Sequence, residues 1–133
     1  MTLTKPSSSL LKKTLLANAL FSDLCGVIML LGATTIAPLI GLNSPMILAF
    51  IGIDLMVYGV WLFFTARRAE PNLTLAKIAV AADVAWVIGA AIVIWLGVLN
   101  TTGNLILAGV TDVVLLFAIL QWVGIRRLQS QLG

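Results

Sequence analysis

Long apolar stretches constrain what this chain can fold into. Between Lys77 and Asn100 the sequence reads IAVAADVAWVIGAAIVIWLGVL, in which only Asp83 is neither apolar nor small. A run of about 20 such residues is long enough to cross the hydrocarbon core of a bilayer as a helix. Three further stretches share this pattern, each with one aspartate and no basic residue between its ends. The sequence therefore predicts spans at about 15–42, 46–66, 77–99 and 105–125.

The low content of charged residues agrees with this prediction. Charged residues make up 10% of the 133-residue chain and hydrophobic residues 61%, whereas soluble domains carry about 25% charged residues. A water-soluble fold would have too little polar surface to cover it. We therefore expect an all-α integral membrane protein, a four-helix bundle in which residues 1–133 form one transmembrane domain.

The placement of the basic residues predicts the orientation in the membrane. They lie near both ends of the chain and around the central loop, and none lies in the turns at 43–45 and 100–104. Under the positive-inside rule, both termini and the central loop are then cytoplasmic, which requires an even number of spans. The predicted cytoplasmic anchors are Lys12, Lys13, Arg67, Arg68, Lys77, Arg126 and Arg127.

The second half of the chain repeats landmarks of the first half at an offset of 58 to 60 residues. The matched pairs are Asp23 and Asp83, Asp54 and Asp112, and Arg67 and Arg126. We interpret 15–68 and 77–127 as two repeat units, each a helical hairpin that begins and ends in the cytoplasm. Because both copies have the same orientation, the repeat would be parallel, about an axis along the membrane normal.

Each predicted span carries one aspartate: Asp23, Asp54, Asp83 or Asp112. A charged side chain at the centre of a membrane helix costs about 2.5–3.5 kcal/mol. Four lipid-facing carboxylates would cost on the order of 10 kcal/mol, so we expect these side chains to face the bundle interior or a wet cavity. The spans offer no basic partner, and we therefore expect some of the carboxyls to carry a proton at neutral pH.

Two interpretations of these aspartates are open. Protonated carboxyls can donate hydrogen bonds between helices and so serve as structural links. Intramembrane carboxyls also mark sites that exchange protons or hold a cation. Asp54 is the best single candidate for such a site because Tyr58 (i+4) and Trp61 (i+7) share its helix face. The two aromatic residues are candidate neighbours of the site, although packing or an interfacial belt also accounts for them.

Small residues spaced by four predict surfaces where helices approach closely. They are Ala33, Ala37 and Gly41 in the first span, and Ala81, Ala85 and Gly89 in the third. Such ridges form either an interface within the chain or a dimer contact.

The residue inventory excludes several kinds of site. The chain has no histidine and a single cysteine, Cys25. This rules out His-ligated haem, the usual zinc sites, a Ser-His-Asp triad and an intramolecular disulfide. The spacing of the acidic residues matches no metal-ligand motif, and the loops are too short to build a polar site. We therefore expect no enzyme, no metal and no cofactor.

In overall design the chain resembles the small, largely uncharacterised bacterial membrane proteins with four spans. The resemblance rests on Asn18–Gly26 (NALFSDLCG), on Arg67-Arg68 after the second span, and on Ala82–Gly89 (ADVAWVIG). It implies a multi-pass protein of the bacterial inner membrane. The chain is also similar in size and span count to the small multidrug resistance transporters, which carry a membrane-embedded glutamate in the first helix. Here Asp23 is the nearest substitute for that glutamate.

Two function classes follow from the sequence. The first is a non-enzymatic accessory, assembly or structural partner in the bacterial membrane, which we favour because no catalytic constellation, soluble domain or nucleotide motif is present. The second is a small proton- or cation-coupled transporter that uses the intramembrane aspartates. In either case the expected partners are the lipid bilayer and a homo-oligomer or larger membrane complex, without nucleic acid.

Overall fold

The computed structural model describes residues 6–69 and 72–132, and all regular structure in that part of the chain is helical. The helices are α1 (Pro6–Leu31), α2 (Ala33–Leu39), α3 (Pro45–Ala66), α4 (Leu73–Leu96) and α5 (Thr101–Leu132). All of these except α2 are long and apolar enough to cross a membrane. The prediction of an all-α chain with four candidate membrane spans is therefore confirmed.

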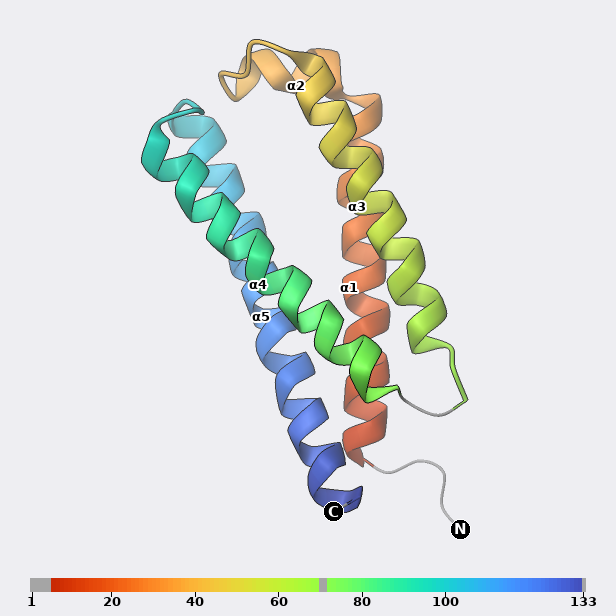
Figure 1. Cartoon of the computed structure of the whole chain (residues 1–133). Coiled ribbons are helices and arrows are strands. Elements are labelled where there is room, and N and C mark those ends of the chain that lie inside the picture. Colours follow the sequence, from red (N-terminus) through yellow and green to blue (C-terminus); the bar gives the residue numbers. More distant parts are fainter. Residues whose placement is uncertain (1–5, 70–71, 133) are drawn as a thin grey trace.

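The long helices form two antiparallel hairpins, α1 with α3 and α4 with α5 (Figure 1). Helix α1 packs along most of α3 and also contacts α5, whereas α3 and α4 make few contacts. The hairpins lie close together at the end where α1 begins and α5 ends, and they diverge towards the opposite end (Figure 1). The structure is therefore joined at one end and splayed at the other.

The predicted anchors gather at the joined end. The start of α1, the end of α3, the start of α4 and the end of α5 all lie there (Figure 1), and the seven basic residues named above lie in or next to these segments. Two of the guanidinium groups lie over aromatic rings one turn earlier. Arg67 is 5.4 Å from the ring centroid of Phe63, and Arg126 is 5.9 Å from that of Trp122.

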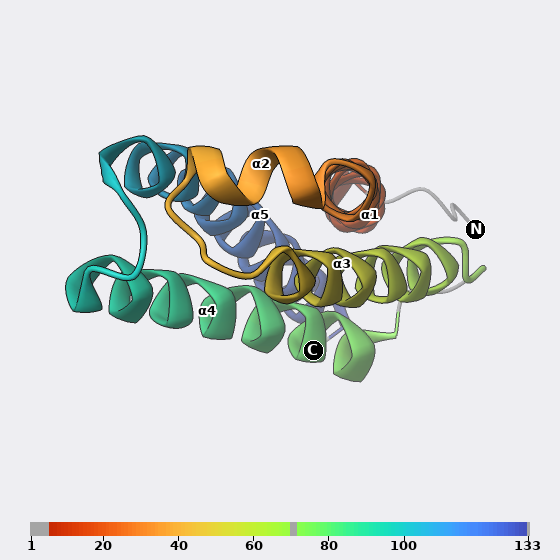
Figure 2. The same ribbon diagram turned by 90° about the horizontal axis from the view of Figure 1, so that it is seen from above.

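The first predicted span, 15–42, is divided in the structure. Helix α1 ends at Leu31, and Gly32 adopts φ −97° and ψ 8°, outside the helical region. Helix α2 then runs across the splayed end, from the end of α1 towards the start of α5 (Figure 2). Gly32 favours a break at this position because glycine is a poor helix former.

One residue ties α2 to the second hairpin. The backbone N–H of Asn100 donates to Ile40 O at 3.0 Å, and its side-chain amide donates to Leu39 O at 3.0 Å. These are carbonyls at the end of α2, which have no partner within that helix. The Asn100 side-chain oxygen also accepts from Gly103 N at 2.8 Å, which caps the first turn of α5. The splayed end is therefore bridged through α2.

Helix α4 begins and ends earlier than the predicted span 77–99, and α5 extends beyond the predicted span 105–125 at both ends. Helix α4 starts at Leu73 because the side chain of Asn72 accepts a hydrogen bond from Leu75 N at 3.0 Å. It ends at Leu96, where Gly97 adopts the left-handed conformation with φ 72°, and the N–H of Val98 reaches back to Val93 O. Sequence periodicity does not include these capping residues, so it misplaces the ends.

Glycines set the close approach of α1 and α3. A Cβ on Gly26 would lie 2.5 Å from Gly52 O, and a Cβ on Gly52 would lie 2.7 Å from Gly26 O. A Cβ on Gly59 would meet Ala19 O at 2.9 Å. Side chains at these positions would therefore force the helices apart.

The small-residue ridges predicted from spacing do not form this contact between α1 and α3. In α2, Ala33 and Ala37 are buried, but in α4 the residues Ala81 and Ala85 are exposed and Gly89 has no atom within 4 Å of a would-be Cβ. The α4 ridge is therefore not used within the chain.

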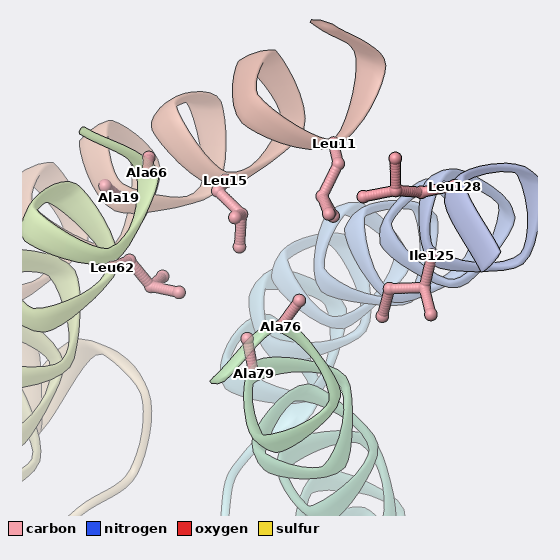
Figure 3. Close-up of a cluster of buried hydrophobic side chains, with 9 residues drawn as sticks. All are labelled: Leu11, Leu15, Ala19, Leu62, Ala66, Ala76, Ala79, Ile125 and Leu128. Carbon is pink, nitrogen blue, oxygen red and sulfur yellow. The ribbon is translucent and has the colours of Figure 1, made fainter. Parts of the chain in front are cut away.

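A cluster of nine buried side chains holds the two hairpins together at the joined end (Figure 3). Every long helix contributes: Leu11, Leu15, Ala19, Leu62, Ala66, Ala76, Ala79, Ile125 and Leu128. A smaller cluster of Ala33, Ala37, Ile40 and Leu48 packs α2 against α3 at the splayed end. Between these two apolar clusters, the facing sides of the helices carry polar residues.

Candidate functional site

Asp83 lies at the centre of the polar region between the clusters. It projects from α4 and is only 3% exposed. Its Oδ2 atom accepts hydrogen bonds from Asn18 Nδ2 and from Gln121 Nε2, each at 2.9 Å. Its Oδ1 atom lies 2.9 Å from the hydroxyl of Tyr58. One carboxyl group therefore joins α4 to α1, α5 and α3.

Asn18 is the second hub of this network. It is 1% exposed, and its amide group donates both to Asp83 and to Gln121 Oε1, the latter at 3.1 Å. Its oxygen accepts from the hydroxyl of Ser22, one turn further along α1, at 3.3 Å. Both amide hydrogens and the amide oxygen of Asn18 are therefore in use.

Gln121 completes the network from α5. It is fully buried, donates to Asp83 and accepts from Asn18. Buried polar groups are costly unless they are paired, and a fully satisfied network fixes the relative positions of the helices that carry it. The network therefore aligns all four long helices at one level.

Tyr58 brings α3 into the network. Its hydroxyl lies 2.9 Å from Asp83 Oδ1 and 3.1 Å from the backbone oxygen of Ala79, one turn before Asp83 on α4. The ring of Trp61 stacks on the ring of Tyr58, with centroids 6.0 Å apart and planes at 25°. Of the two predicted neighbours of the site, Tyr58 contacts the carboxyl of Asp83, and Trp61 stacks on the ring of Tyr58.

A cavity of about 280 Å³ adjoins this network. Helices α1, α3, α4 and α5 all line it, and its wall contains two carboxyls, Asp54 and Asp83. The rest is mostly apolar and aromatic: Asn18, Phe21, Ser22, Cys25, Leu55, Tyr58, Ala82, Trp86, Val110 and Val114. Its volume lies just below the ~300–1,000 Å³ of ligand pockets, so it suits a small ligand or several water molecules.

The structure separates the four predicted aspartates. Asp83 is buried, whereas Asp54 lines the same cavity but is exposed, which places it at the open edge. Asp23 is half-buried in the contact of α1 with α3, where its Oδ1 lies against Gly59 without a hydrogen-bond partner. Asp112 is exposed and does not line the cavity. In the single chain, the expectation that all four face the bundle interior or a wet cavity does not hold for Asp112.

Trp86 contributes aromatic surface to the cavity wall, on α4 close to one turn after Asp83. Its Nε1 atom is buried and has no hydrogen-bond partner among the described residues, although buried indole N–H groups usually have one. The wall thus combines carboxyl groups with aromatic surface.

Sequence reasoning missed three members of the network, Asn18, Ser22 and Gln121. The signal was available, because Asn18 and Ser22 lie one helical turn apart inside an apolar run, and Gln121 lies well inside the last span. Polar side chains within membrane spans are costly unless they bond across helices. Their presence in a span was therefore as informative as that of the aspartates.

The residues that line the cavity suit a small organic cation better than a multivalent metal ion. In the part of the chain that the structure describes, no group of three or more His, Cys, Asp or Glu side chains lies close enough to hold a metal ion. Two carboxyls beside the rings of Phe21 and Trp86 can instead bind a small organic cation, through charge and through the aromatic faces.

Comparisons with protein-family models, with curated proteins and with solved structures found no match to this chain. Its function therefore has to be argued from the geometry of the site.

Proposed function

We propose that this chain is a small proton- or cation-coupled transporter of the bacterial inner membrane, with its site at the cavity between Asp83 and Asp54. One observation carries the proposal: a buried carboxyl that bonds to three other helices also lines a cavity. A purely structural link needs no cavity beside it. A binding site needs a carboxyl that is both fixed in position and accessible.

The cavity offers a cation two carboxyl groups and aromatic rings, which membrane lipid tails lack. Asp54, at the open edge, is the first carboxyl that an entering cation meets, and Asp83 lies deeper. The aromatic rings of Phe21 and Trp86 line the wall around these carboxyls. Because neither carboxyl has a basic hydrogen-bond partner among the described residues, a proton or a bound cation is the natural counter-charge. Competition of the two for one carboxyl would couple their movements.

The proposed orientation puts both termini in the cytoplasm. The gathering of the basic segments at one end of the molecule supports this through the positive-inside rule. The parallel repeat has support from the two cation–π pairs, Phe63 with Arg67 and Trp122 with Arg126. Corresponding members of the two pairs are 59 residues apart. The cavity then lies on the outer side of the apolar cluster that closes the joined end.

Transport in proteoliposomes tests the proposal. The vesicles contain a pH-sensitive dye, and benzyltrimethylammonium is added outside, because a permanently charged cation cannot cross as a neutral amine. Exchange of the entering cation for an internal proton makes the lumen alkaline. We expect this signal for the wild type and its loss in Asp83→Asn, with a weaker signal in Asp54→Asn. Asp112→Asn, which lies outside the cavity, is the matched control and retains the signal.

Two results would contradict the proposal. One is a wild-type signal no larger than that of protein-free vesicles, for benzyltrimethylammonium and for Na⁺ alike. The other is a signal in Asp83→Asn equal to that of the wild type.

A second candidate function is the non-enzymatic accessory or assembly role, in which the chain packs against another membrane subunit or a second copy. Asp112 supports it, because an exposed carboxyl within a membrane span is costly against lipid and favourable against a polar partner. The unused ridge of Ala81, Ala85 and Gly89 on α4 also permits close approach of another helix.

Cysteine cross-linking distinguishes a second copy from lipid on the α4 ridge. In a Cys25→Ser background, Gly89→Cys is expected to form a covalent dimer in native membranes. Gly109→Cys is the control, because Gly109 is exposed on α5 and also has no neighbour within 4 Å. Equal cross-linking at both positions would show only random collision, and co-purification of a different subunit would indicate a heteromeric complex.

A further inference from the structure

The hydroxyl of Tyr58 lies between two acceptors on α4. It is 2.9 Å from Asp83 Oδ1 and 3.1 Å from Ala79 O. A tyrosine hydroxyl has one hydrogen, so it donates fully to only one of these at a time. The oxygen itself can also accept a hydrogen bond. The geometry therefore permits two complete hydrogen-bond arrangements, which differ in the protonation of Asp83.

In the first arrangement Asp83 is ionised. The Tyr58 hydroxyl donates to Oδ1, while the amides of Asn18 and Gln121 donate to Oδ2. The carboxylate then accepts three hydrogen bonds, which is a favourable setting for a buried negative charge. Ala79 O keeps its place in the helical ladder and needs no further donor.

In the second arrangement Asp83 carries a proton on Oδ1. That O–H donates to the oxygen of Tyr58, and the Tyr58 hydroxyl turns to donate to Ala79 O. The two amide donors on Oδ2 are unchanged, because a carboxylic acid retains its carbonyl oxygen as an acceptor. Every polar side-chain atom of Asp83, Tyr58, Asn18 and Gln121 therefore keeps a hydrogen-bond partner.

We infer that Tyr58 is a hydroxyl switch that lets Asp83 take up and release a proton without losing a hydrogen bond. To protonate Asp83, a hydronium ion in the cavity transfers its proton to Oδ1 and becomes water. The Tyr58 O–H bond rotates and does not break, so the tyrosine stays neutral throughout. In the reverse step, cavity water accepts the proton from Oδ1 and the hydroxyl turns back.

The neighbouring groups leave this role to Tyr58. Helix α1 presents the neutral Asn18 and Ser22 to the network and Cys25 to the cavity, and α5 presents the neutral Gln121 with Val110 and Val114. Helix α3 contributes Asp54 at the cavity edge beside Tyr58. Asp23, on α1, lies against Gly59 of α3. Among these groups, only Tyr58 bonds both to Asp83 and to an alternative acceptor.

Infrared difference spectroscopy in lipid tests the switch. The C=O band of protonated Asp83 is assigned by its absence in Asp83→Asn. In Tyr58→Phe, the Oδ1–H of Asp83 loses its acceptor, so we expect the band to move to higher frequency. Trp61→Phe is the matched control, because it disturbs the stacked ring but keeps the hydroxyl, and its band is expected to stay in place.

A second measurement needs no substitution. Tyr58 is the only tyrosine of the chain, so ring-deuterated tyrosine labels it alone. As the pH is lowered, its C–O band is expected to shift together with the appearance of the Asp83 band, because the hydroxyl changes its acceptor. A Tyr58 band that does not follow Asp83, an Asp83 band unmoved in Tyr58→Phe, or no Asp83-dependent band at any accessible pH would each overturn the inference.

A role of the Tyr58 switch in transport rests on the proposed function. The experiments can nevertheless contradict the switch and the transporter separately. Cation flux in the wild type with an unmoved Asp83 band removes the switch and keeps the transporter. A shifted band without cation flux supports the switch and contradicts the transporter.

Discussion

Replacement of Asn18 by leucine tests whether the polar network holds the helices together. Leucine has the same number and branching of side-chain heavy atoms, so the substitution removes the amide without leaving a hole. It deletes the bond to Asp83 Oδ2 at 2.9 Å, the bond to Gln121 Oε1 at 3.1 Å and the bond accepted from the Ser22 hydroxyl at 3.3 Å. Asp83 Oδ2 keeps its donor from Gln121, but Gln121 Oε1 becomes a buried acceptor without a donor.

The expected loss of stability follows from these contacts. Side-chain hydrogen bonds between membrane helices contribute about 0.6 kcal/mol on average and at most about 1.7 kcal/mol. A buried acceptor left unpaired adds about 1–3 kcal/mol. Three lost bonds and one unpaired acceptor therefore predict that Asn18→Leu lowers the free energy of unfolding by about 3–5 kcal/mol.

Reversible unfolding in mixed detergent micelles, followed by circular dichroism, measures this change. Ser22→Ala is the matched control on the same helix, because it removes only the 3.3 Å bond to Asn18 and should cost about 0.5 kcal/mol. In a Gln121→Leu background, Asn18→Leu should cost about 0.6 kcal/mol less, since its bond to Gln121 is already gone. The difference is small because Asp83 Oδ2, without its last amide donor, replaces Gln121 Oε1 as the unpaired acceptor. A cost of Asn18→Leu no greater than that of Ser22→Ala would refute the reasoning.

Three further substitutions probe the helix contacts and ends. Gly26→Leu should destabilise the chain by about 1–3 kcal/mol because its side chain meets Gly52 O, whereas Gly109→Leu should be neutral in the same unfolding assay. Asn72→Ala should cost about 0.5–2 kcal/mol through the lost cap of α4, and Asn72→Asp should retain most of that stability. Asn100→Ala should raise the amide exchange rates of α2 by removing its side-chain bond to Leu39 O, with the rates of α3 unchanged. An equal rise in both helices would indicate global destabilisation.

The sequence by itself determined that the chain has four apolar helices suited to a membrane, and it located one carboxyl in each. These properties depend on the length and composition of each run, which are local and need no knowledge of neighbours. It did not locate the break at Gly32, because apolar residues continue on both sides of it. The caps at Asn72 and Asn100 likewise depend on hydrogen bonds that periodicity does not describe.

Only the tertiary structure decided which aspartate is buried and what surrounds it. Each membrane helix is apolar around most of its circumference, so the sequence pattern does not show which face points inward. That rotation is set by contacts between helices, such as the close approach of Gly26 and Gly52 and the apolar cluster at the joined end. Asn18 and Gln121 bond across 103 positions of sequence. Their meeting at Asp83 therefore follows from packing, which no single span encodes.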